Sequence, residues 1–131
     1  ELNDFNNDRF LQGYHFGKNF KSLDPKPDAI FIYSDLMAVG FENGLLEEGI
    51  QIPEDIAIVG FDGIEASMLA SVPITTVLQP VEKIGRLAVE IIQKRIEGSD
   101  IGNRTILKPT LVIRDSCGAK KLYSANELQV G

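Results

Sequence analysis

Several residue patterns that define common protein classes are scarce or missing in this 131-residue chain. It has one cysteine, Cys117, so no disulfide can form within it, and a buried or incidental thiol in a reducing cytoplasm is expected. Lysine and arginine number 13 against 19 aspartates and glutamates, which gives a net charge of -6. A phosphate-binding surface normally carries a basic excess, so any contact with DNA must come from elsewhere in the protein.

Long apolar runs are also missing. None approaches the ~20 residues that cross a bilayer, and the amino terminus lacks the basic and apolar regions of a secretory signal. We therefore expect a cytoplasmic protein, although a mature exported protein would show the same pattern.

The chain has little that would support catalysis. The glycine-rich phosphate loops GxGxxG and GxxxxGK[ST] and the nucleophile motif GxSxG do not occur. The sole histidine, His15, has no cysteine, histidine or carboxylate at metal-ligand spacing. The sequence thus predicts no enzyme, no cofactor and no metal site.

What the chain does have is enough apolar material, 44% of its residues, for the core of one domain. Residues 56–61, IAIVGF, form an unbroken apolar run that ends at Asp62 and Gly63. A run without polar alternation is typical of a strand covered on both faces, as in a parallel sheet packed between helices.

Strand-like and helix-like segments alternate along the chain. Strands are predicted at residues 29–33, 56–61 and 74–78, with an edge or crossing strand within residues 106–115; helices are predicted at residues 8–23, 36–48 and 80–97, with a short helix or turn at residues 64–72. Gly40 and Gly44, inside the second helix, indicate close packing against another element. This order predicts an α/β fold with a parallel sheet flanked by helices.

Polar side chains follow three of these strands. Ser34 and Asp35 follow the first, Asp62 the second and Gln79 the third. The carboxyl ends of parallel strands lie at one rim, where ligands bind in open α/β sheets. Carboxylates and amides there suit the hydroxyls of a small polar ligand, and turn formation or helix capping is the alternative.

Four motifs in order carry a family resemblance. They are SDLMAVG, IPEDIAIVGFD, PITTVLQP and LVIRDSC, and the resemblance covers about residues 29–118. In these motifs the chain resembles the carboxyl-terminal half of a lactose-repressor-type (LacI/GalR) bacterial transcription regulator.

The resemblance implies a periplasmic-binding-protein-like (type I) effector domain, with two α/β lobes that close on a small molecule, usually a sugar or related metabolite. It places residues 1–78 and 110–118 in the second lobe, residues 79–109 in the crossover and a first-lobe helix, and residues 119–131 in a tail. It also implies operator DNA as a partner, bound through an amino-terminal headpiece that these residues do not contain.

The resemblance assigns residue roles as well. Asp62 matches the aspartate that binds ligand, and Ser34 stands where the family usually has asparagine. Asp35 follows it, with helix capping as the alternative, Gln79 lies in the crossover, and Phe5 matches a ring-stacking aromatic.

A homodimer is implied too, through surfaces that here include Met37, Val39, Met68 and Leu69, with ordinary core packing as the alternative. The competing function is an exported sugar-binding protein of a transporter, which shares the fold. PITTVLQP and RDSC resemble the repressor pattern and favour the regulator.

Overall fold

The computed structural model describes residues 2–99, 102 and 104–119, and the side chains of residues 8–99, 102 and 104–119. The chain divides into two compact units. The sheet unit comprises residues 1–78 and 111–131, and the helix unit comprises residues 79–110.

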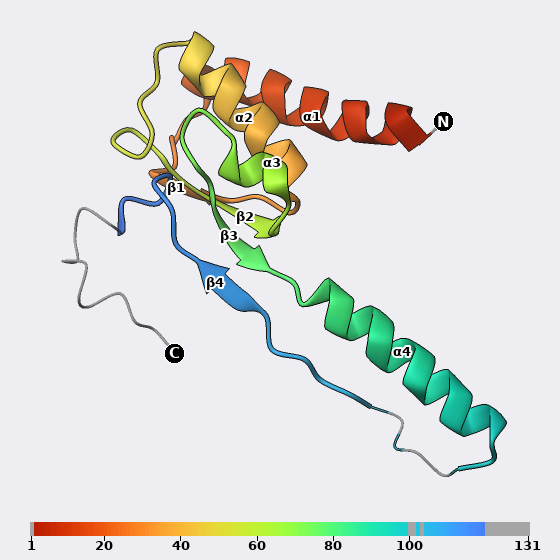
Figure 1. Cartoon of the computed structure of the whole chain (residues 1–131). Coiled ribbons are helices and arrows are strands. Elements are labelled where there is room, and N and C mark those ends of the chain that lie inside the picture. The colour runs from red at the N-terminus through yellow and green to blue at the C-terminus, as the bar shows by residue number, and fades with distance from the viewer. Residues whose placement is uncertain (1, 100–101, 103, 120–131) are drawn as a thin grey trace. The chain divides into compact units, whose positions relative to one another are not determined.

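A four-stranded sheet forms the centre of the sheet unit (Figure 1). Its strands are β1 (Ala29–Phe31), β2 (Ala57–Asp62), β3 (Thr75–Leu78) and β4 (Thr110–Val112), in the spatial order β1-β2-β3-β4. β1 pairs with β2 and β2 with β3, both in parallel. The predicted parallel sheet is confirmed, and β4 is the expected edge strand.

Helices α1 (Leu2–Lys18), α2 (Asp35–Glu47) and α3 (Glu65–Met68) gather on one side of this sheet (Figure 1). The burial of β2 alternates accordingly: Ile58 and Gly60 are buried, whereas Ala57, Val59 and Phe61 are partly exposed. Within the described residues the apolar run of β2 is therefore not buried equally on its two faces, contrary to the sequence prediction. An unbroken apolar run shows that both faces are apolar, but not which segment covers each face.

Two pairs of glycines let α1 and α2 pack closely. A Cβ atom added at Gly40 would overlap the backbone of Phe10, and one at Gly44 would overlap the backbone of Tyr14. Gly13 and Gly17 of α1 face the backbone of α2 in the same way. A glycine inside a helix costs roughly 1 kcal/mol relative to alanine, and the close contact of the two backbones explains that cost here.

The first helix begins earlier than the sequence indicated. α1 starts at Leu2 rather than Asp8, and a short 3-10 helix (Phe20–Ser22) follows it before the prolines. No proline or glycine precedes Gly13, so nothing in the first residues breaks a helix, and Asp8 lies inside it instead of capping it.

The helix unit is built on α4 (Val81–Ile96), which has no buried residue. Part of its apolar stripe, Ile84, Leu87 and Ile91, lines a shallow hollow together with Leu107. Ile92 and Ile96 are 59% and 81% exposed. None of the helices in the described part of the chain combines the length and apolar character that a bilayer span requires.

Candidate functional site

The carboxyl ends of three strands lie at one rim of the sheet. Asp62, the last residue of β2, is paired with Leu78, the last residue of β3. Ser34 and Asp35 follow β1 closely, and the amide of Ile32 donates to the carbonyl of Val59 at 2.8 Å, which continues the pairing beyond β1. The structure thus brings Ser34, Asp35 and Asp62 to one edge, as parallel strands require.

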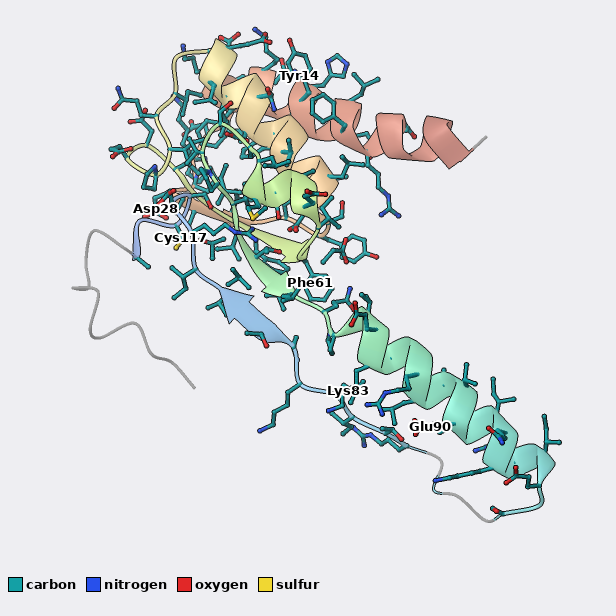
Figure 2. All side chains as sticks on the ribbon, viewed as in Figure 1. Tyr14, Asp28, Phe61, Lys83, Glu90 and Cys117 are labelled. Atoms are coloured by element: carbon teal, nitrogen blue, oxygen red, sulfur yellow. The ribbon has the colours of Figure 1, made fainter. Side chains whose placement is uncertain are left out.

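Asp62 is half-buried and sits in an unusual backbone conformation. Its φ is 114°, and that of Gly63 is 77°. Figure 2 labels its neighbour Phe61 at the end of β2. A non-glycine residue with positive φ is strained by about 1–3 kcal/mol and persists only where its surroundings hold it, which is common at ligand sites.

Asp35 is hydrogen-bonded to this turn. Its side chain is fully buried. One carboxylate oxygen accepts hydrogen bonds from the backbone amides of Gly63 and Ile64, both at 2.9 Å. The other accepts from the hydroxyl of Thr76 at 2.6 Å. The carboxylate therefore links the start of α2, the turn after β2 and strand β3.

Two residues that complete this cluster were missed by sequence reasoning. Thr76 is a fully buried hydroxyl in β3, and Gly60 lies opposite Asp35, where an added Cβ would overlap the carboxylate oxygen Oδ1. A lone glycine inside an apolar strand indicates a close approach by another group, so Gly60 carried a usable signal. Nothing comparable in the sequence indicated Thr76, which is simply a polar residue in the β-branched run ITTVL.

The other predicted ligand residues are placed differently. Ser34 is 2% exposed, has a φ of 98°, and caps α2 by accepting a long hydrogen bond from the amide of Met37 at 3.4 Å. Gln79 is half-buried and is the first residue of the helix unit. Phe5 lies in α1, and its side chain is outside the described residues. The ligand-binding roles of these residues stay predictions.

The segment after β4 stabilises the strands behind the rim. The hydroxyl of Ser116 donates to the carbonyl of Ile58 at 2.6 Å and accepts from the amide of Thr75 at 2.9 Å. The guanidinium of Arg114 donates to the carbonyl of Ile74 and to the hydroxyl of Ser67, at 2.7 and 3.0 Å. The motif LVIRDSC thus has a structural explanation, because it joins β2, β3 and α3.

A second buried carboxyl group lies in α2, away from the rim. Glu42 is 1% exposed; one of its oxygens accepts from the amide of Val72, and the other has no hydrogen-bond partner among the described residues. Burial raises the pKa of Glu42, and the hydrogen bond from Val72 partly opposes that rise.

An apolar hollow of about 300 Å³ lies beside β1, between Phe16, Phe31 and Met37, and its lining residues do not include Ser34, Asp35 or Asp62. No group of three or more histidine, cysteine, aspartate or glutamate side chains suited to a metal ion occurs in the part of the chain that the structure describes.

Residues 4–117 match the family of periplasmic binding protein-like domains, and the chain belongs to that family. Within it, the similarity is to LacI-type regulators. HTH-type transcriptional repressor MelR of Bacillus subtilis is 41% identical over 107 residues, which are 82% of this chain and 31% of MelR.

Solved structures agree. A LacI family transcriptional regulator from Arthrobacter, in complex with lactose, matches 80% of this chain and 41% of its own, at 33% identity and a TM-score of 0.71. The lac repressor dimer bound to operator matches 82% of this chain and 37% of its own, at 25% identity and a TM-score of 0.76.

The predicted resemblance and the periplasmic-binding-protein-like fold are confirmed. The chain spans about a third of the length of the curated relatives that it matches. Those relatives are transcriptional and operon repressors.

Proposed function

We propose that this chain forms most of the second lobe of an effector-binding domain, which senses a sugar or related metabolite for a DNA-binding transcription regulator. The observation that carries the proposal is Asp62, a carboxylate at the carboxyl end of β2 held in a strained conformation. Strained residues at the ligand edge of an α/β sheet are typical of binding sites.

The rest of the protein would complete the pocket. In this proposal α4 and the residues up to about 109 belong to the first lobe, and the ligand binds between that lobe and the rim that carries Asp62. The exposed apolar stripe of α4 supports this assignment, because Ile92 and Ile96 are 59% and 81% exposed within the described residues. Operator binding belongs to a headpiece elsewhere in the protein, as the acidic composition of this segment favours.

The similarity to repressors supports the regulator over an exported sugar-binding protein. Sugars bound in the solved relatives supply a first panel of candidate effectors: lactose, sucrose and cellobiose.

Calorimetry of the full-length protein with these three sugars tests the site. Asp62→Asn removes a charge-assisted hydrogen bond and is expected to weaken binding by about ten- to hundredfold, or roughly 1.5–3 kcal/mol. Asp55→Asn is the matched control: Asp55 is exposed, precedes β2 and accepts from the amide of Gln51 at 2.8 Å. If Asp62→Asn bound the sugar with wild-type affinity, Asp62 would not be a ligand-binding residue.

A homodimer is proposed through the surface around α3. Met68 and Leu69 are 50% and 71% exposed, whereas Met37 and Val39 are partly buried against the core. Leu69→Glu is therefore the clean test, because it places a charge on the exposed part of the surface without disturbing packing. We expect the Leu69→Glu variant of the full-length protein to sediment as a monomer, with a circular dichroism spectrum like that of the wild type. A dimer in this variant would place the interface elsewhere.

A further inference from the structure

The turn after β2 contains a conformation that its own sequence does not favour. Among the described residues, Ser34 and Asp62 are the non-glycine residues with positive φ, and both lie at the rim. Asp35 lies between them in the structure, because it follows Ser34 in the chain and its carboxylate reaches the turn after Asp62.

The hydrogen bonds of Asp35 act on the two peptide groups that follow Asp62. Gly63 and Ile64, whose amides donate to it, are the two residues that follow Asp62. The bond from Thr76 fixes the second carboxylate oxygen to β3. With its side chain fully buried and both oxygens accepting from the protein, Asp35 has no surface to offer a ligand.

We propose that Asp35 is a positioning residue: it holds Asp62 in the left-handed conformation that presents its carboxylate at the rim, and it does not itself contact the effector. The conformational part of this proposal concerns the turn alone. The part that concerns affinity rests on the proposed function.

The conformational part is tested by amide hydrogen exchange in the full-length protein. Asn at position 35 keeps the size of the side chain but carries no charge. If its oxygen faces the two amides, they exchange a charged acceptor for a weaker neutral one, and if its NH₂ group faces them, they lose their acceptor. We expect the amides of Gly63 and Ile64 to exchange at least about tenfold faster in Asp35→Asn. The amide of Ile58, which donates to the carbonyl of Ser116, serves as an internal reference and keeps its rate.

Two further variants sharpen this measurement. Thr76→Val removes the hydroxyl donor and leaves both backbone bonds, so it gives a smaller acceleration at Gly63 and Ile64, about two- to fivefold, and it replaces Asp35→Asn if that variant does not fold. Asp55→Asn, the same chemical change at the amino-terminal side of β2, leaves both amides unchanged. Unchanged exchange at these amides, or an equal acceleration at Ile58, would overturn the proposal, since Asp35 would then be idle or a general core residue.

The affinity part is tested by a double-mutant cycle with whichever of lactose, sucrose and cellobiose binds the wild-type protein. Asp35→Asn and Asp62→Asn are each expected to weaken binding about tenfold or more, and the double variant to be within about twofold of Asp62→Asn. Fully additive losses, about a hundredfold in the double variant, would show that Asp35 affects binding independently of Asp62, and the positioning role would be wrong.

The two proposals fail in different ways. If Asp62→Asn binds sugar as the wild type does, the proposed ligand site is wrong. If Asp62→Asn weakens binding and the double variant shows additive losses, the site stands and the positioning role is wrong. If none of the three sugars binds, the exchange rates of Gly63 and Ile64 still decide whether Asp35 holds the turn.

Discussion

Helices α2 and α4 are both rich in apolar residues, and they are buried to opposite extents. α2 buries seven of its 13 residues, including the charged residues Asp35 and Glu42. α4 has 16 residues and buries none of them, although its apolar residues recur with the clearer helical spacing. Helical spacing therefore identifies the apolar face of a helix, whereas the segment that covers this face is set by tertiary structure.

The largest expected difference between the two helices is the stability lost when an apolar side chain is truncated. Phe41 of α2 is fully buried, and Phe41→Ala is expected to reduce the free energy of unfolding of the sheet unit by about 3–5 kcal/mol. Ile92 of α4 is 59% exposed, so Ile92→Ala in the 131-residue chain should cost less than ~0.5 kcal/mol. Urea denaturation followed by circular dichroism measures both.

The Ile92→Ala substitution should have different effects in the 131-residue chain and in the full-length protein. If α4 packs in the first lobe, Ile92→Ala in the full-length protein should cost about 2–5 kcal/mol, as a buried isoleucine does. An equally small cost in both proteins would show that the stripe of α4 stays in solvent, and the proposed lobe assignment would then be wrong.

A smaller effect, of opposite sign in the two helices, comes from their glycines. Gly44→Ala in α2 would push a Cβ atom into the backbone of α1 and should destabilise the sheet unit by about 1–3 kcal/mol. A Cβ atom added at Gly85 of α4 would meet no atom within 4 Å beyond its chain neighbours and the backbone of its own helix, so Gly85→Ala should stabilise the helix by about 0.5–1 kcal/mol. Urea denaturation of the 131-residue chain measures the effect of Gly44→Ala. The ellipticity of the chain at 222 nm, which reports helix content, measures the effect of Gly85→Ala.

If both glycine variants lowered stability, α4 would be closely packed in this chain after all. If both raised it, the contact between α1 and α2 would be looser than the structure shows.

Local patterns predicted much of this fold. The apolar run that ends at Asp62 predicted β2 and the place of its carboxylate, and Gly40 and Gly44 indicated a close helix contact whose partner proved to be α1. These features depend on residues within a few positions of one another, so a single sequence can reveal them.

The rest depended on contacts between distant residues. Asp35 meets Thr76, which lies 41 residues further along the chain, and Gly63, which lies 28 residues away. Its sequence neighbourhood predicted a helix start, where capping or ligand contact explains an aspartate equally well. Only the folded chain shows that Ser34 caps the helix and that the carboxylate of Asp35 joins the turn after β2. Likewise, the sequence of α4 does not show which segment packs on its apolar face.

The last prediction compares one glutamate from each helix as pH changes. Glu42 of α2 is buried, and its pKa is raised above the ordinary 4.5, chiefly by burial. A carboxyl group whose pKa is raised by folding contributes stability that is fully present below its ordinary pKa and is lost as pH rises through its folded pKa. Glu42→Gln keeps an acceptor for the amide of Val72 and cannot ionise, so it escapes this loss.

We therefore expect Glu42→Gln to be close to wild type in stability near pH 4 and progressively more stable than wild type as pH rises. Glu90→Gln in α4 is the control, because Glu90 is an exposed partner of Arg86 at 3.5 Å, and such i,i+4 pairs contribute only about 0.3–0.5 kcal/mol. Urea denaturation of the full-length protein from pH 4 to pH 8 gives the comparison. A constant difference between Glu42→Gln and wild type across this range would mean that folding does not raise the pKa of Glu42 in the full-length protein.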